Sequence, residues 1–136
     1  MASFSLTSKG RLATCHPKLI QVMERVILVR DITIIQGHRT PEQHETYLAA
    51  GKTKVEYEQS KHSKQPSLAV DIAPWFKKRP HIRWNDWKSW YVLGGAVIGI
   101  AWNMGIPIRW GGDWDRDWQF GDQTFHDLPH FELMHD

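Results

Sequence analysis

Four polar residues stand where their side chains could carry out chemistry together. Asp71 and His130 each lie in a segment that alternates apolar and polar residues, so each is expected to point away from the aliphatic face of a strand. His62 precedes the first segment, and Asp127 precedes His130 by three residues. Two histidines and an aspartate are good zinc ligands, and three protein ligands leave the fourth zinc position open for water, as hydrolysis requires. Asp127 is then a candidate general base.

Several other motifs are incomplete or ambiguous. A histidine on a strand is more often structural than metal-binding, so spacing alone leaves both interpretations open. The segment from His44 to Leu48 begins like a His-Glu-x-x-His zinc helix but lacks the second histidine, so we expect His44 on an exposed helix face. The repeat Asp113-x-Asp115-x-Asp117 begins like a calcium loop but lacks its glycine and glutamate, and a loop beside the cleft is the favoured interpretation. His126 is a second candidate acid or base, although alternation predicts that it points elsewhere.

Four short segments are predicted to form strands. Each is rich in β-branched or alternating apolar residues. Alternation in the last segment places His130 and Glu132 on one face. The four segments are Ile32–Gln36, Leu68–Ala73, Ile106–Trp110 and His130–Met134.

Two helices are predicted in the first half of the chain. Thr14 is expected to cap a helix with Pro17 in its first turn, and an apolar stripe continues to residue 27. Thr40 is expected to cap the second helix, with Gln43 completing a capping box and Gly51 marking the end. A long loop should follow, over residues 52–67.

A third helix is expected from a cap at Asn85 or Asp86 to about Met104, with Gly105 as its stop. Helices and short strands without regular βαβ units indicate an α+β fold, with a short antiparallel sheet packed against about three helices. The candidate zinc site would then lie in a cleft on the sheet. The apolar stripe of this helix is predicted to contain Val92, Ala96, Ile100 and Met104.

Size and composition limit the remaining possibilities. The 136 residues fit one domain, residues 1–136, with residues 1–14 as an N-terminal extension. A formal charge of +2 with scattered lysines and arginines argues against nucleic-acid binding. The single cysteine excludes an internal disulfide, and no segment has the pattern of a signal peptide or a membrane span. We therefore expect a monomer without stable membrane insertion.

Three blocks of sequence, in order, resemble the M15 family of zinc peptidases, and most closely the phage endolysins that are L-alanyl-D-glutamate peptidases. The likeness spans roughly residues 15–134. One departure is the spacing from His62 to Asp71, which is two residues longer than the family pattern, with Ser67 in place of a glycine. The blocks are Gly37-His38-Arg39-Thr40 with Gln43, then Ser60-Lys61-His62 followed by Ala69-Val70-Asp71, and Asp127-Leu128-Pro129-His130-Phe131-Glu132.

The resemblance implies one Zn²⁺ per chain and a function in peptidoglycan hydrolysis. His62, Asp71 and His130 would be the zinc ligands, and Asp127 the acidic catalytic residue. Arg39 would stabilise the oxyanion, although a salt bridge that closes the cleft is the alternative. Residues expected to support a ligand or contact substrate are Glu132, Gln43 and Ser60.

The implied substrate is a stem peptide of peptidoglycan, cut at the L-Ala–D-Glu amide. Such an enzyme would be made in the host cytoplasm and act on the wall after release. Two alternatives stay open at this point: a D-Ala-D-Ala carboxypeptidase, and a catalytically silent domain that binds the wall or a partner. An intact Asp127 beside three intact ligands argues against the silent domain, because a binding domain needs no general base.

Overall fold

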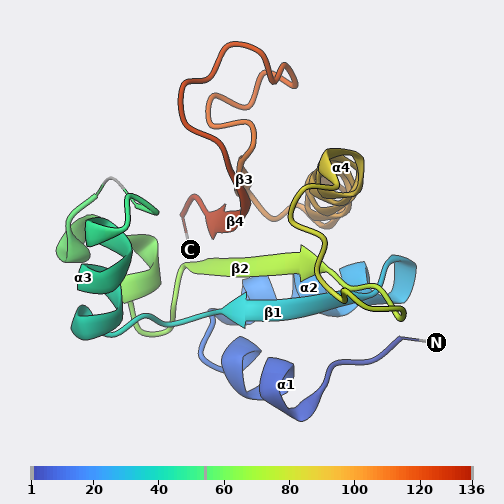
Figure 1. Cartoon of the computed structure of the whole chain (residues 1–136), viewed down its shortest axis with the longest axis horizontal. Coiled ribbons are helices and arrows are strands. Elements are labelled where there is room, and N and C mark those ends of the chain that lie inside the picture. The colour runs from blue at the N-terminus through green and yellow to red at the C-terminus, as the bar shows by residue number, and fades with distance from the viewer. Residues whose placement is uncertain (1, 54, 136) are drawn as a thin grey trace.

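The computed structural model describes residues 2–53 and 55–135. Within them the chain forms four α-helices and one antiparallel sheet with strand order β1-β2-β4-β3 (Figure 1). The predicted α+β fold with a short antiparallel sheet is confirmed. The elements are α1 (Leu6–Leu12), α2 (Pro17–Val29), β1 (Ile32–Gln36), α3 (Pro41–Ala49), the 3₁₀ turns η1 (Tyr57–Gln59) and η2 (Lys61–Ser63), β2 (Ala69–Pro74), α4 (Trp87–Met104), β3 (Ile108–Gly111) and β4 (Asp127–Leu133).

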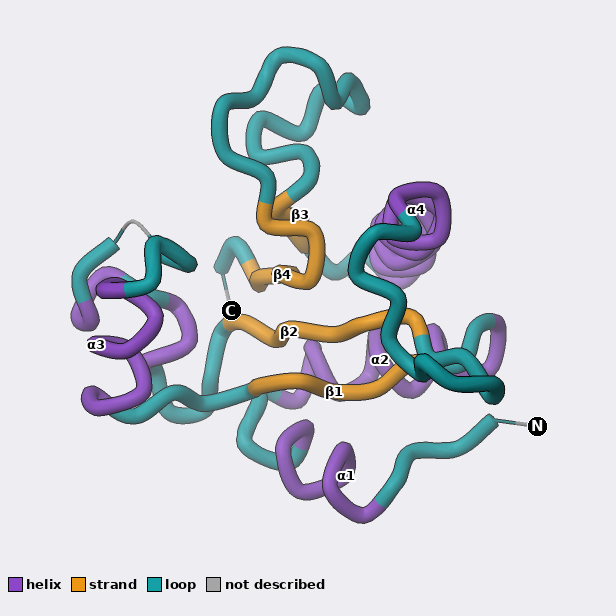
Figure 2. Tube along the Cα trace, in the orientation of Figure 1, coloured by secondary structure: helices purple, strands orange, loops and turns teal. Residues whose placement is uncertain are grey.

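Helices α2 and α4 pack against each other and against the sheet (Figure 2). The buried apolar core consists mainly of side chains from these two helices and from the strands. Helix α1 has a different place, along the outer edge of β1. The Ser8 hydroxyl accepts a hydrogen bond from the Ile34 N–H at 3.0 Å, and Arg11 donates to the Ile34 carbonyl at 3.0 Å. Helix α1 therefore satisfies backbone groups that an edge strand would otherwise expose. This helix was not predicted, and it lies in the stretch set apart above as an N-terminal extension.

The cap of α2 differs from the prediction. His16, not Thr14, is the N-cap residue, and its Nδ1 accepts a hydrogen bond from the Lys18 N–H at 3.1 Å. The Thr14 hydroxyl donates instead to the Arg11 carbonyl at 2.7 Å and accepts from the His38 N–H at 2.8 Å. Thr14 thus ties α1 to the turn after β1, a tertiary role that competes with capping.

The predicted ends of α3 and α4 are confirmed. Thr40 and Gln43 form the capping box of α3. Asp86 caps α4, and Gly105 ends it in the left-handed conformation with φ of 71°. Among the described residues, no helix is long and apolar enough to cross a membrane.

The predicted buried face of α4 is partly correct, because Ile100 and Met104 are partly buried and pack against the core. Val92 is 70% exposed. Gly94 faces the sheet instead, and a Cβ atom there would come within 2.3 Å of the Trp110 ring. Because Gly94 has no side chain, the helix can approach Trp110 closely. The side of α4 that carries Gly94 therefore faces the sheet, in place of the side that carries Val92. The buried residues of α4 are Trp90, Leu93, Gly94, Val97 and Ala101.

Strand register decides which polar side chains meet. β2 and β4 pair with Asp71 opposite His130, while β3 and β4 pair with Glu132 opposite Arg109. Directly opposed residues in an antiparallel pair have Cβ atoms about 5 Å apart, so their side chains can interact. β1 has its predicted bounds, whereas β4 begins at Asp127, three residues earlier than expected. Pairing therefore extends to Asp127, opposite a bulge in β3.

Candidate functional site

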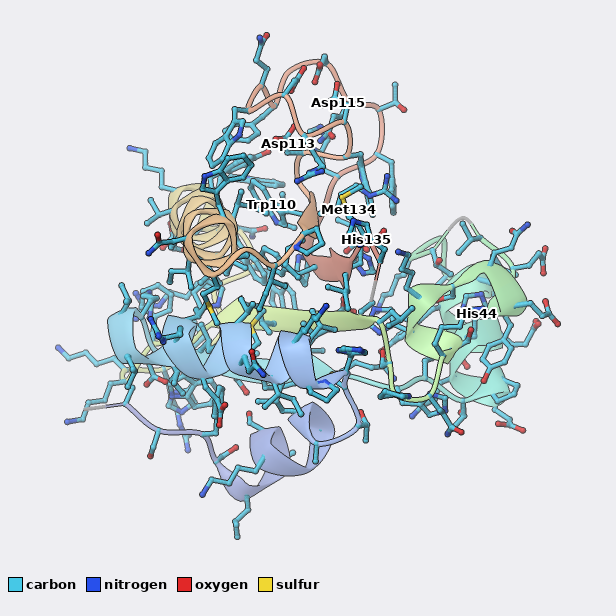
Figure 3. All side chains as sticks on the ribbon, turned by 180° about the vertical axis from the view of Figure 1, so that it is seen from behind. His44, Trp110, Asp113, Asp115, Met134 and His135 are labelled. Carbon is cyan, nitrogen blue, oxygen red and sulfur yellow. The ribbon has the colours of Figure 1, made fainter. Side chains whose placement is uncertain are left out.

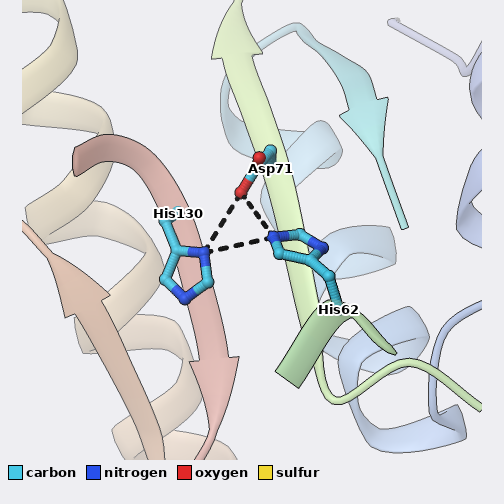
Figure 4. Close-up of side chains that lie close together, drawn as sticks. All are labelled: His62, Asp71 and His130. Carbon is cyan, nitrogen blue, oxygen red and sulfur yellow. Dashed lines mark hydrogen bonds and ion pairs between the residues drawn. The ribbon is translucent and has the colours of Figure 1, made fainter. Parts of the chain in front are cut away.

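The side chains of His62, Asp71 and His130, hereafter the His/Asp triad, meet beside strands β2 and β4 (Figure 4). They come from η2, β2 and β4 respectively. Asp71 Oδ1 lies 3.0 Å from His62 Nε2 and 3.2 Å from His130 Nδ1, and these two nitrogens are 3.2 Å apart. The three candidate ligands are thus brought together, despite the longer loop between the first two.

The outer ring nitrogens of both histidines have their own partners. His62 Nδ1 lies 2.8 Å from the Gly37 carbonyl oxygen, to which it can only donate. His130 Nε2 lies 2.8 Å from Glu132 Oε1, on the face that the alternation of β4 predicts. With the outer nitrogen of each ring acting as donor, the neutral tautomer leaves the inner nitrogen with a lone pair. Such outer partners orient the histidines of metal sites.

The electrostatics of the triad favour a cation at its centre. Burial acts to raise the pKa of Asp71. When the inner ring nitrogens carry protons in place of a metal ion, the charge of His62 and the hydrogen bonds of both histidines hold this pKa well below its usual range. Burial acts to lower the pKa of His130, but hydrogen bonds with Asp71 and Glu132, and the charges of Asp71 and Asp127, raise it to about 10. For Glu132, the bonds to His130 and Arg109 outweigh burial and lower the pKa to about 2.

The donor set fits a zinc ion. The three ligand atoms lie within 4.8 Å of one another. Ligands of a tetrahedral ion with bonds of about 2.0 Å are separated by about 3.3 Å, close to the spacings within the triad. Two neutral imidazole nitrogens and one carboxylate oxygen are ligands that zinc accepts. The triad therefore forms a candidate metal-binding group.

Arg39 forms an ion pair with the Asp71 oxygen that faces away from the two histidines. It is buried, and its guanidinium lies 3.6 Å from Asp71 Oδ2 and donates to Gln36 Oε1 at 3.2 Å. Burial lowers the pKa of Arg39, although the nearby Asp71 carboxylate acts to raise it. Gln36 Nε2 donates a hydrogen bond to Gln43 Oε1 at 3.1 Å, so Gln43 is connected to Arg39 through Gln36. The salt bridge left open above for Arg39 is therefore present, and Arg39 also lines the cleft.

Ser60 holds the turn that carries His62. Its hydroxyl accepts a hydrogen bond from the His62 N–H at 3.2 Å and caps η2. Ser60 is buried and lines the cleft beside His62. Its contacts are those of a residue that positions the imidazole.

A cleft of about 600 Å³ lies over the triad, between α3 with its following loop and the loop of residues 112–126. Asp127 lines this cleft at the start of β4. Burial, followed by the charge of Asp71, raises the pKa of Asp127 to about 6. His126 also lines the cleft, contrary to the prediction that it points elsewhere. Strand β4 begins at Asp127, so His126 lies in the preceding loop, where the alternation of side chains along a strand does not apply. Aromatic walls that the sequence did not single out are Tyr47, Trp84, Trp114 and Phe125.

The two incomplete motifs have different outcomes. His44 is fully buried, not exposed as predicted, and its Nε2 lies 2.7 Å from the Val55 carbonyl oxygen. This bond ties the loop after α3 back onto the helix, a partner that no helical pattern reveals. Asp113 and Asp115 lie on the loop that projects beyond β3 and β4, far from His44 (Figure 3). With Asp117 they bring three carboxylate oxygens within 4.8 Å of one another, and these three residues are called the acidic loop cluster below.

Comparison with known proteins identifies the family of the chain. The model of the family described as phage L-alanyl-D-glutamate peptidase matches residues 1–134. The crystal structure of the L-Ala D-Glu endopeptidase ChiX from Serratia marcescens superposes with a TM-score of 0.73 at 23% identity, covering 96% of this chain and 90% of that one, which supports the same fold. A search of curated proteins found no match. The chain therefore belongs to the phage L-alanyl-D-glutamate peptidase family.

Proposed function

We propose that this peptidoglycan peptidase hydrolyses the L-Ala–D-Glu amide of the stem peptide, with one zinc ion bound by His62, Asp71 and His130. The observation that carries the proposal is the convergence of these three ligand atoms at 3.0–3.2 Å, with Asp127 on the wall of the same cleft. Family membership supports the identity of the bond. We also infer that residues 1–136 act as a single monomeric peptidase domain.

A bound zinc ion would supply a Lewis acid that polarises the amide carbonyl and makes a water molecule more acidic. Asp127 would accept a proton from the attacking water and pass it to the leaving nitrogen of D-Glu. Its raised pKa, about 6, suits both steps, because the carboxylate is ionised at neutral pH and its conjugate acid is still strong enough to protonate an amine. Cleavage thus leaves a carboxylate on L-Ala and a free amine on D-Glu.

The surrounding residues would position these groups. Arg39 bonds to the outer oxygen of Asp71 and lines the cleft, so we infer that it orients that ligand and adds positive charge near the developing oxyanion. Glu132 would fix the tautomer of His130, and Ser60 would hold the backbone of His62. Gln43 would act indirectly, by holding Gln36 against Arg39.

Mass spectrometry of digested peptidoglycan tests the proposal. The protein is incubated with purified wall after chelation, and again after zinc is restored. Fragments that begin with D-Glu, released only with zinc, are the expected result. Loss of a terminal D-Ala alone would transfer the activity to a carboxypeptidase, and an unchanged wall would favour a domain that only binds it.

A further inference from the structure

We propose that Lys52 binds a carboxylate of the substrate, namely the α-carboxylate of the D-Glu residue whose amine leaves. This inference rests on the proposed function and deepens it, because it names the chemical group that the cleft recognises beside the scissile bond. It comes from the charged residues of the cleft and from the backbone that holds Lys52.

Three of the four lysine and arginine side chains described in the cleft are already engaged. Arg39 pairs with Asp71 at 3.6 Å. Arg109 donates to Glu132 Oε2 at 2.8 Å through Nη2 and at 3.2 Å through Nε. Lys61 lies 3.9 Å from the same carboxylate and donates to two carbonyl oxygens at the end of β4. The charges of these three side chains are therefore paired with groups of the protein.

Lys52 is different. Among residues 2–53 and 55–135, no carboxylate lies within ion-pair distance of its ammonium group. Its ammonium nitrogen lies 5.6 Å from the centre of the Tyr47 ring, and Arg39 lies over the same ring at 4.4 Å. Lys52 thus lines the cleft with a charge that no carboxylate of the described residues pairs with, on the wall that also carries Arg39. A lysine in this state is free to bind an anion.

The backbone of Lys52 is held in place, although its side chain is exposed. The Lys52 N–H donates to the Tyr47 carbonyl at 2.9 Å, and the Gly51 N–H donates to the Leu48 carbonyl at 3.1 Å. With Gly51 at a φ of 72°, these two bonds form the Schellman motif that ends α3. The motif directs the chain after α3 back over Tyr47, so the position of Lys52 in the cleft follows from the helix end.

The chemistry of the stem peptide selects one carboxylate. The acyl side of the scissile amide is L-Ala, which has no acidic side chain. D-Glu is joined to the next residue through its side-chain carboxyl group, so its α-carboxylate is free unless it is amidated. That carboxylate is attached to the carbon that bears the scissile nitrogen, and no other carboxylate of the peptide is as close. It is therefore the anion that a cation in the cleft wall meets when the amide lies over the triad.

Kinetics with two matched peptides test the inference. One is N-acetyl-L-Ala-γ-D-Glu-L-Lys amide, and the other carries a carboxamide in place of the α-carboxylate. The variants are Lys52→Met, which keeps the aliphatic stem against Tyr47, and Lys52→Arg, which keeps the charge. Lys88→Met is the matched control, because Lys88 is an exposed lysine on α4 that does not line the cleft. Thermal unfolding of each variant checks the fold.

We expect the unmodified protein to prefer the carboxylate peptide by roughly tenfold in kcat/KM, as for one charge-assisted contact at an open site. Lys52→Met should cleave both peptides equally, whereas Lys52→Arg and Lys88→Met should keep most of the preference. A preference that survives in Lys52→Met, or equal cleavage by the unmodified protein, would overturn the role of Lys52 but leave the proposed function intact. Failure to cut either peptide with zinc present would refute the proposed function, and this inference with it.

Discussion

Two groups of side chains in this molecule bring three ligand atoms within 4.8 Å of one another, yet they are built in different ways. The His/Asp triad draws on a 3₁₀ turn and two paired strands, and both of its histidines are buried. The acidic loop cluster comes from five consecutive residues of one loop, and Asp115 and Asp117 are exposed. Proximity of ligand atoms alone does not distinguish the two groups.

The difference lies in what surrounds the ligand atoms. In the triad, Gly37, Glu132 and Arg39 occupy the outer atoms, so the inner atoms are left facing one another. In the acidic loop cluster, both oxygens of Asp113 accept hydrogen bonds from backbone N–H groups of the same loop, at 3.3 and 2.9 Å. Its carboxylates therefore order the loop, whereas the triad is ordered by the rest of the fold. Such preorganisation is what a catalytic metal site requires.

Removal of one triad member is the strongest test of this contrast. His130→Ala should reduce zinc from about one ion per chain to almost none and abolish peptidase activity, because two ligands cannot hold the ion in a catalytic geometry. Zinc analysis of dialysed protein and a wall-digestion assay measure the two effects. Asp115→Asn is the matched change in the acidic loop cluster and should keep its zinc. Tight zinc binding by His130→Ala would contradict the assignment of this ligand.

Asp127 should separate catalysis from metal binding. Asp127→Ala is expected to lower kcat/KM by roughly 10²–10⁴-fold, the range for loss of a general acid–base group. Its zinc content should stay at about one per chain, because Asp127 is not a member of the triad. Loss of zinc in this variant would mean that the residue is a ligand instead.

A substitution of Glu132 tests whether the hydrogen-bond partners on the outer atoms of the triad contribute to zinc affinity. Glu132→Gln should weaken zinc affinity by roughly 10–100-fold, because a neutral amide is a poorer acceptor for the His130 N–H. Competition with a chromogenic chelator measures the affinity. Arg109→Gln is the control, since it removes the ion pair between Arg109 and Glu132 and leaves the bond to His130 and the ion pair with Lys61. Equal affinities for Glu132→Gln and the unmodified protein would show that the triad does not depend on its outer partners.

The features that sequence predicted correctly depend on neighbours close along the chain. The capping box of Thr40 and the left-handed stop at Gly105 each involve residues a few positions apart. The alternation that directs Asp71 and His130 to one face is likewise local. Short-range patterns of this kind impose the same structure in most tertiary environments, so they can be recognised in a single sequence.

The features that sequence missed depend on distant partners. His44 is buried because of the carbonyl of Val55, and α4 turns its Gly94 face inward because of Trp110. The pairing of Asp71 with His130 was expected, but it joins residues 59 positions apart, and alternation within each strand does not specify it. Local pattern does not determine such contacts. The resemblance to a family, not the periodicity, selected the triad among eight histidines.

The pH dependence of activity should follow Asp127. Because this carboxyl must be ionised to accept a proton, kcat/KM should rise with pH through about 6. Its effect on stability has the opposite sign: a raised folded pKa favours the protonated form, so its contribution is full below the ordinary value of 3.8 and is lost as the pH rises through about 6. A fall in activity towards pH 5 is therefore not unfolding driven by Asp127. A flat profile between pH 5 and 7 would contradict the role of Asp127 as base.

The acidic loop cluster provides the control for that profile, because Asp122 on the same loop also titrates near pH 6. A hydrogen bond shared with Asp117 raises the pKa of Asp122 to about 6, as when two neighbouring carboxylates hold one proton. Asp117→Asn removes the charge that favours the shared proton, so the pKa of Asp122 should fall towards 3.8, as carboxyl-carbon NMR can follow. If the pH profile of kcat/KM keeps its midpoint in Asp117→Asn, the rise in activity near pH 6 reflects the ionisation of Asp127. If the midpoint moves with Asp122, the exposed loop controls the buried site, and the contrast between the two groups breaks down.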